Sequence, residues 1–110
     1  MELNIKDRLY LTQILPQNNN FLDFVTKKAI IKKTAITPEE KENFNIVENA
    51  QEGRITWDVE KDLANPLVID FTETELDLLK RGCEARSESV CPDDFWVTVE
   101  KIYDAINAGN

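Results

Sequence analysis

The sequence predicts an α+β fold in which N-terminal helices precede a small three-stranded sheet, and two C-terminal helices pack on that sheet. Two Thr-x-x-Glu motifs, which begin at Thr37 and Thr72, have the capping-box pattern that marks the start of a helix. Between them lie short runs rich in β-branched and aromatic residues, bounded by turn-forming residues, as in strands. Near the end of the chain apolar residues recur at spacings of four, three and four, which indicates an amphipathic helix: Phe95, Val99, Ile102 and Ile106.

We expect three helices in the N-terminal part of the chain. The first covers residues 5–14, with Asn4 as its cap and Pro16 as its stop, because the residue before a proline avoids helical angles. The second covers about residues 22–34, a segment without glycine or proline. Its lysines fall within the arc of its apolar residues, so neither a helical nor a strand period fits cleanly and a strand stays the alternative. The first capping box then begins a short helix over residues 38–43.

Three strands are expected between and around these motifs, over residues 44–48, 54–59 and 67–71. Turn-forming residues around Gly53 separate the first two strands, which should therefore pair in a mostly antiparallel sheet. In the second strand Ile55, Trp57 and Val59 alternate with polar residues, as a sheet with one solvent-exposed face requires. We therefore expect Trp57 to lie in the core.

The third strand should lead directly into a helix over residues 73–86, capped by the second Thr-x-x-Glu motif. Phe71 and Leu76 occupy the two positions of a hydrophobic staple, so the end of the strand should pack on the first turn of the helix. Cys83 lies on the apolar face of the same helix and is expected to be a buried thiol. The last helix is expected over residues 93–107, with acidic residues at its start that suit the helix dipole.

Two aromatic residues, Trp96 and Tyr103, border the apolar stripe of the last helix one heptad apart. Such residues either close a hydrophobic core or form the edge of a partner-binding surface, where aromatic side chains are enriched. Both alternatives stay open from the sequence.

Composition sets limits on the class of protein. A chain of 110 residues with 42% hydrophobic residues predicts one globular domain over residues 1–110. No apolar run approaches the roughly 20 residues that a membrane span needs. The first residues include acids where a signal peptide would be cationic and then apolar. Two cysteines are too few for a disulfide scaffold, so we expect a cytoplasmic protein.

The residue types argue against catalysis. The chain has no histidine, which removes the commonest general base and the commonest zinc ligand together. Cys83 and Cys91 lack the spacing of a redox pair and cannot complete a four-ligand metal site. The three glycines are not clustered, so no phosphate-binding loop is present. We expect no enzyme, no catalytic residues, and no metal or cofactor.

The net charge of −8 hides an asymmetry along the chain. Residues 1–36 carry six cations and three acids, a balance of +3, whereas residues 37–110 carry seven cations and eighteen acids, a balance of −11. A basic head on an acidic body can bind an acidic protein surface, a second copy of the chain, or nucleic acid.

We therefore expect a non-enzymatic protein-interaction module that binds another protein or a second copy of itself. The alternative is a winged-helix-like nucleic-acid-binding protein that uses the basic segment 27–33, an idea based on fold analogy alone. The negative net charge argues against it. An acidic mimic of DNA is a further alternative, although its carboxylates are tied to helix starts. The candidate partner-binding residues are Lys27, Lys28, Lys32, Lys33, Trp96 and Tyr103.

Five short motifs occur in an order that spans most of the chain. They are Arg8-Leu9-Tyr10-Leu11, Ile14-Leu15-Pro16, Ile36-Thr37-Pro38-Glu39-Glu40, Gly53-Arg54-Ile55-Thr56-Trp57 and Phe71-Thr72-Glu73-Thr74-Glu75. This order resembles small uncharacterised proteins encoded in bacterial genomes and prophages. The resemblance implies an accessory protein of a mobile element. It implies no catalytic residues, because such families have no assigned activity.

Overall fold

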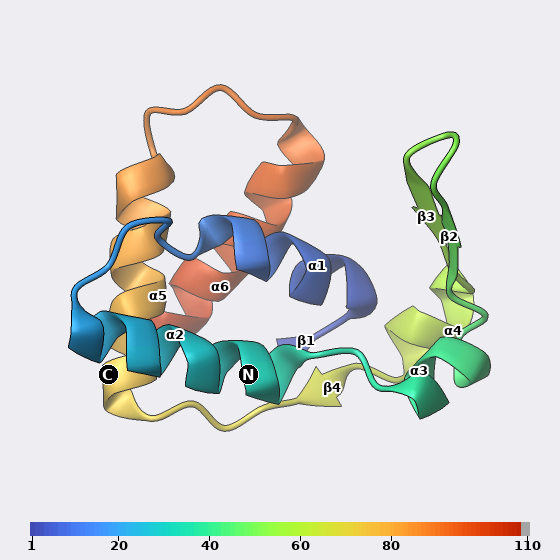
Figure 1. Cartoon of the computed structure of the whole chain (residues 1–110), viewed down its shortest axis with the longest axis horizontal. Helices are drawn as coiled ribbons and strands as arrows, with labels where there is room; N and C mark the ends of the chain where they lie inside the picture. The colour runs from blue at the N-terminus through green and yellow to red at the C-terminus, as the bar shows by residue number, and fades with distance from the viewer. Residues whose placement is uncertain (109–110) are drawn as a thin grey trace.

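A computed structural model describes residues 1–108, which contain six helices and two small antiparallel sheets of two strands each (Figure 1). The helices are α1 (Ile5–Ile14), α2 (Phe21–Thr34), α3 (Pro38–Asn43), α4 (Val59–Ala64), α5 (Glu73–Arg86) and α6 (Asp93–Ala108). The strands are β1 (Glu2–Leu3), β2 (Val47–Asn49), β3 (Arg54–Thr56) and β4 (Leu67–Val68). The α+β class is therefore confirmed. Among residues 1–108, no helix has both the length and the apolar character that crossing a bilayer requires.

Capping chemistry sets the helix starts. Thr37 and Thr72 each accept the backbone N–H of the third helical residue, whose carboxylate in turn accepts the N–H of the cap, so both predicted capping boxes are confirmed. A third box, formed by Asn4 and Asp7 at the start of α1, was not predicted. Asn20 caps α2 through a 2.8 Å hydrogen bond from the Asp23 amide, and residues 21–34 are helical, which excludes the strand alternative.

The predicted three-stranded sheet is wrong. β4 pairs with β1, which the sequence analysis did not anticipate, with Leu67 opposite Leu3. Residues 47–49 and 54–56 form a separate hairpin, in which Gly53 has a φ of +64° that glycine adopts without strain. Neither strand of this hairpin has a buried residue, so the hairpin has no face on which the C-terminal helices could pack.

Local signals explain why the strands are shorter than expected. Phe44 ends α3, and Asn45 has a φ of +53°, which interrupts an extended strand at once. At the other end of the hairpin, the Asp58 side chain accepts the Lys61 amide at 3.2 Å and caps α4. Residue 58 is therefore a helix cap, not the polar position of an alternating strand.

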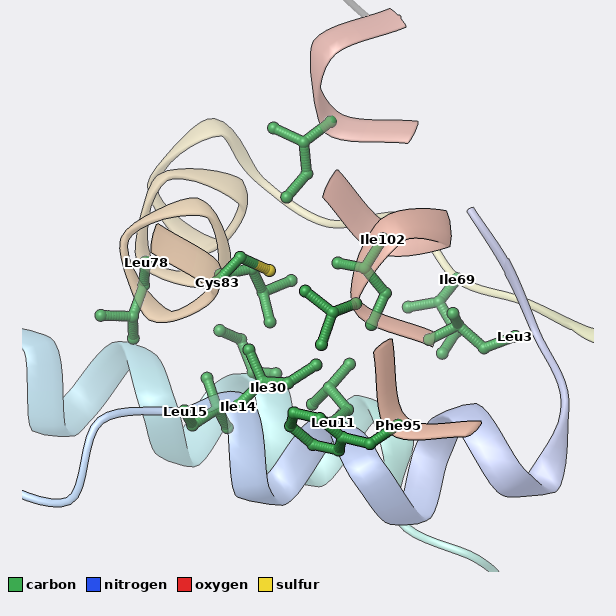
Figure 2. Packing of buried hydrophobic residues seen from close by; sticks show 13 residues of the cluster. Leu3, Leu11, Ile14, Leu15, Ile30, Ile69, Leu78, Cys83, Phe95 and Ile102 are labelled. Atoms are coloured by element: carbon green, nitrogen blue, oxygen red, sulfur yellow. The ribbon is translucent and has the colours of Figure 1, made fainter. Parts of the chain in front are cut away.

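The core lies between the N-terminal and the C-terminal helices. α1 packs against α5 and α6, and α2 packs along α5 (Figure 1). Figure 2 shows their apolar side chains converging with Leu3 of β1 and with Ile69, the residue after β4, and the half-buried Leu67 packs against this cluster. The C-terminal helices therefore pack on α1 and α2 and not on a sheet. The buried cluster comprises Leu3, Leu11, Ile14, Leu15, Ile30, Ile69, Leu78, Leu79, Cys83, Phe95, Val99, Ile102 and Ile106.

Trp57, which was expected in the core, and Phe71 of the predicted staple are both only half-buried. Phe71 and its staple partner Leu76 pack against the cluster from its edge. Trp57 is also half-buried, but Ile55 and Val59 are exposed at 40% and 53%, so the expected apolar strand face is wrong.

Residues 38–66, from α3 to the loop before β4, form an arm at one side of the molecule (Figure 1). The Asp62 carboxylate connects this arm to α1 by accepting the Ile5 amide at 3.0 and 3.1 Å. Within the arm, Lys61 Nζ donates to Asn43 O at 2.8 Å and joins α4 to α3. These hydrogen bonds position the hairpin beside the start of α1.

Gly82 allows α5 to approach α1 closely. A Cβ at this position would lie 2.5 Å from the backbone oxygen of Ile14. Alanine favours a helix over glycine by about 1 kcal/mol, but this contact opposes that gain. We expect Gly82→Ala to lower the free energy of unfolding by about 1–3 kcal/mol, as overpacking does. Urea unfolding measures the change, and an increase in stability would contradict the close approach of the two helices.

Candidate interaction surfaces

α2 buries one side against α5 and leaves the opposite side open. Ile30 and Thr34 face inward and are buried. The outward residues recur at helical spacing and combine large apolar side chains with two lysines. We call this set the α2 face: Phe21, Phe24, Val25, Lys28, Ile31 and Lys32, with Leu22 at its edge.

The exposure of the α2 face is unusual for apolar side chains. Phe21 is 74% exposed and Leu22 is 75% exposed. Phe24, Val25 and Ile31 are exposed at 49%, 48% and 39%. A contiguous apolar patch of this kind marks an interaction site more often than scattered exposed residues do. It also explains why lysines share the arc of the apolar residues in the sequence: that arc faces solvent and not the core.

The structure divides the four candidate lysines into two pairs. Lys27 Nζ donates to Pro16 O at 2.8 Å, on one flank of α2. On the other flank, Lys33 Nζ donates to Glu75 Oε1 at 2.5 Å and to Asp70 O at 3.0 Å. Lys28 and Lys32 lie between these flanks and take part in no ion pair within the described part of the chain. The Lys28 ammonium lies 5.6 Å from the Phe24 ring centroid.

Lys33 therefore helps to hold α2 against α5. Burial tends to raise the pKa of the Glu75 carboxyl, but hydrogen bonds from Lys33 and from the Thr72 amide outweigh burial and hold that pKa below its ordinary value. The contact joins the end of α2 to the start of α5, so we do not include Lys33 in the α2 face.

Trp96 and Tyr103 come together in a groove of about 700 Å³ between α5 and α6. Both rings are half-buried: they pack against the core and also line the groove. Trp96 also meets Phe95 edge to face, with 5.4 Å between ring centroids. We call this site the α5/α6 groove, lined by Cys83, Glu84, Ser87, Trp96, Val99, Glu100, Tyr103 and Asp104.

The α5/α6 groove has an acidic rim. Glu84, Glu100 and Asp104 are exposed, and none of the described residues that line the groove is a lysine or an arginine. The three carboxylates form no ion pair with any residue in positions 1–108. The rim was not predicted, although Glu100 lies one helical turn from both Trp96 and Tyr103.

A second cleft, of about 640 Å³, lies between α1 and the arm. Leu9, Ile55 and Trp57 are among its lining residues, and the buried Trp57 indole N–H has no hydrogen-bond acceptor within the described residues. Burial raises the pKa of the Asp62 carboxyl beside it, although the hydrogen bond from the Ile5 amide acts in the opposite direction. This cleft could not be predicted from the sequence, because its walls come from segments about 50 residues apart.

Both cysteines are free thiols in different surroundings. Burial raises the pKa of the Cys83 thiol to about 11, whereas Cys91 is half-buried at the turn before α6. We expect a thiol reagent to modify Cys91 in the folded protein and Cys83 only after unfolding. Peptide mass spectrometry after timed labelling with and without urea measures this, and faster labelling of Cys83 would contradict its burial.

In the part of the chain that the structure describes, no three His, Cys, Asp or Glu side chains converge on a possible metal site.

The fold and the two surfaces describe a small α+β protein with an apolar–basic helix face on α2 and an aromatic–acidic groove between α5 and α6. No family model, curated protein or solved structure matches the chain.

Proposed function

We propose that this chain is a non-enzymatic protein-interaction module that binds a protein partner through the α2 face. The observation that carries the proposal is the exposure of five large apolar side chains on and beside this face, from Phe21 to Ile31. Covering such a side chain fully contributes about 1.5–3 kcal/mol, so a partner that covers several of them gains a substantial free energy of binding.

The two lysines of the α2 face indicate the chemistry of the partner. Lys28 and Lys32 lie within the apolar patch, so a partner surface that covers the patch also meets two ammonium groups. Burying an unpaired charge is costly, and carboxylates on the partner remove that cost. The proposal therefore specifies a partner surface that is apolar at its centre and acidic beside it.

A double variant of the α2 face tests the proposal. Phe21→Ser with Phe24→Ser should leave the fold intact, because both side chains are largely solvent-exposed. Affinity capture from the native cell should then lose a partner that the wild-type chain retains, and the purified partner should bind the wild-type chain directly in calorimetry. Val47→Ser with Val90→Ser removes two other exposed apolar side chains, at 57% and 101% exposure, and should retain the partner. Equal capture by all three proteins would overturn the proposal.

Nucleic-acid binding is the second candidate, favoured by the lysines of α2 and the hairpin that follows. Figure 1 shows α2 and the β2–β3 hairpin at opposite sides of the molecule, whereas a wing acts beside its recognition helix. Lys28 and Lys32 together would engage about two phosphates, with a log–log salt slope near −1.8 on duplex DNA.

Fluorescence anisotropy with labelled duplex and single-stranded DNA separates the two candidates. We expect no binding at physiological salt, because the −11 balance of residues 37–110 repels a phosphate backbone. Micromolar binding that is lost on Lys28→Glu with Lys32→Glu would favour the nucleic-acid function.

A further inference from the structure

We propose that the partner of the α2 face is the α5/α6 groove of a second copy of this chain, so that copies associate head to tail. This inference rests on the proposed function, because it names the partner for the same α2 face. Three properties of the two surfaces carry it: charge, apolar content and geometry.

The charges of the two surfaces are complementary. The α2 face presents Lys28 and Lys32, and the groove presents Glu84, Glu100 and Asp104. The six ion pairs of the described residues use none of these five side chains. Each surface therefore has a charge surplus that the fold does not neutralise, and the two surpluses are opposite in sign. Such complementarity steers association and selects one docking mode over others.

The apolar parts also match. The groove offers Trp96 and Tyr103, half-buried rings of the kind that anchor interfaces, with Val99 between them. The α2 face offers the aromatic rings of Phe21 and Phe24 at the end of the helix opposite to Lys32. Aromatic pairs of this kind contribute about 0.5–1.5 kcal/mol beyond the area that they bury.

The dimensions agree with a helix lying along the groove. The α2 face extends from residue 21 to residue 32, about 18 Å of helix at 1.5 Å per residue. The α6 wall of the groove extends from Trp96 to Asp104, about 14 Å on the same measure, and the α5 wall continues beside it. A helix of this length covers the groove from end to end.

A symmetric contact between two α2 faces is less favourable. It would bring four lysines into one interface, and the acid of α2, Asp23, is already held by Arg81 at 2.9 Å. α2 lies against the side of α5 that carries Asp77 and Arg81, whereas the groove lies toward α6. One copy therefore offers its α2 face to one neighbour and its groove to another, which is a heterologous interface.

A charge swap tests the pairing directly. One variant carries Lys28→Glu and Lys32→Glu on the α2 face, and the other carries Glu100→Lys and Asp104→Lys in the groove. In sedimentation at 50 mM salt, the wild-type chain should show a mass that rises with concentration and falls at 500 mM salt. Each variant alone should associate at least tenfold more weakly, because its two surfaces now have the same sign.

An equal mixture of the two variants should regain association, because each reversed surface then meets one of opposite charge. Matched controls change the net charge equally in the arm: Lys41→Glu with Arg54→Glu, and Glu48→Lys with Glu52→Lys. Both controls should associate like the wild-type chain, and circular dichroism should show that all variants are folded.

Three results would overturn the inference. A mixture that stays monomeric while the wild-type chain associates would place the contact elsewhere. A wild-type chain that is monomeric at every concentration would exclude a second copy as the partner, yet a cellular partner lost on Phe21→Ser with Phe24→Ser would still support the proposed function. Binding of the monomer to anionic vesicles, measured by co-sedimentation, would assign the α2 face to a lipid surface instead.

Discussion

Replacing Arg8 by methionine should lower the free energy of unfolding by about 3–5 kcal/mol, the usual cost of removing one partner of a buried ion pair. Arg8 is only 4% exposed. It donates to Thr34 O at 3.0 Å, to Ala35 O at 2.7 Å and to both carboxylate oxygens of Glu40. Methionine matches the length of the arginine stem but removes the Arg8 donor from Thr34 O and Ala35 O and leaves Glu40 with only its hydrogen bonds from Thr37, which adds the cost of unpaired buried groups.

Arg81→Met is the matched control. Arg81 also donates to two carboxylates, those of Asp23 and Asp77, but its side chain is 48% exposed. We expect this change to cost less than about 1 kcal/mol, as for other exposed ion pairs. Urea unfolding at pH 7 compares the two variants. If the two variants lost the same free energy of unfolding, burial of the Arg8 side chain would not determine its contribution to stability.

The Arg8–Glu40 pair should also make stability depend on pH. Hydrogen bonds from Arg8 are the main reason that the pKa of the Glu40 carboxyl is lowered to about 2. Because this folded-state pKa is below the unfolded value, the ionised Glu40 carboxylate contributes its full stabilisation above about pH 5. This stabilisation is lost as the pH falls toward 2. Between pH 7 and pH 3.5 the wild-type chain should lose about 1–1.5 kcal/mol more stability than Arg8→Met does. Parallel pH dependence of the two proteins would contradict the pairing.

Replacing Asp7 by alanine should destabilise the protein by about 3 kcal/mol. The Asp7 side chain is 2% exposed and accepts three hydrogen bonds: from Asn4 N at 3.1 Å, from Thr98 Oγ1 at 2.8 Å and from Lys101 Nζ at 2.6 Å. Alanine removes the capping box of α1 and leaves the Thr98 hydroxyl buried without an acceptor. It also breaks the buried hydrogen bond that joins α6 to α1 through Thr98.

Two further variants separate these contributions. Asp94→Ala removes a carboxylate that also accepts two side-chain hydrogen bonds, but at 58% exposure it should cost less than about 1 kcal/mol. Adding Thr98→Val to Asp7→Ala should cost less than the sum of the single changes, because no hydroxyl is then left unpaired. If the losses in free energy of unfolding of the two single variants add up to that of the double variant, the hydrogen bond between Thr98 and Asp7 makes no coupled contribution to stability.

The helices could be predicted from the sequence because their signals are local. A capping box needs four residues and an apolar stripe needs about fifteen, so α3 and α5 begin where their threonines place them. The pairing of β1 with β4 joins residues more than 60 positions apart through two residues on each side. No periodicity can be read in two residues, and for this reason the sheet was predicted with the wrong partners.

The candidate surfaces could be predicted only in part, for the same reason. The lysines of α2 and the aromatic residues of α6 are visible as patterns, but Lys27 and Lys33 are held by Pro16 and Glu75, which lie in other elements. The sequence shows that apolar and basic residues share one arc of α2. Only the packing of α2 on α5 shows that this arc faces outward.

The arm of residues 38–66 has a consequence for local unfolding. Of these residues, all of which the structure describes, only Phe44 and Asp62 are buried. With so little apolar area to lose, the arm should open without the four helices that form the core, as a separate cooperative unit. Its backbone amides should therefore exchange with deuterium orders of magnitude faster than those of α5 and α6. A protease should cut first at the tip of the hairpin, near residues 50–53, and leave the core protected.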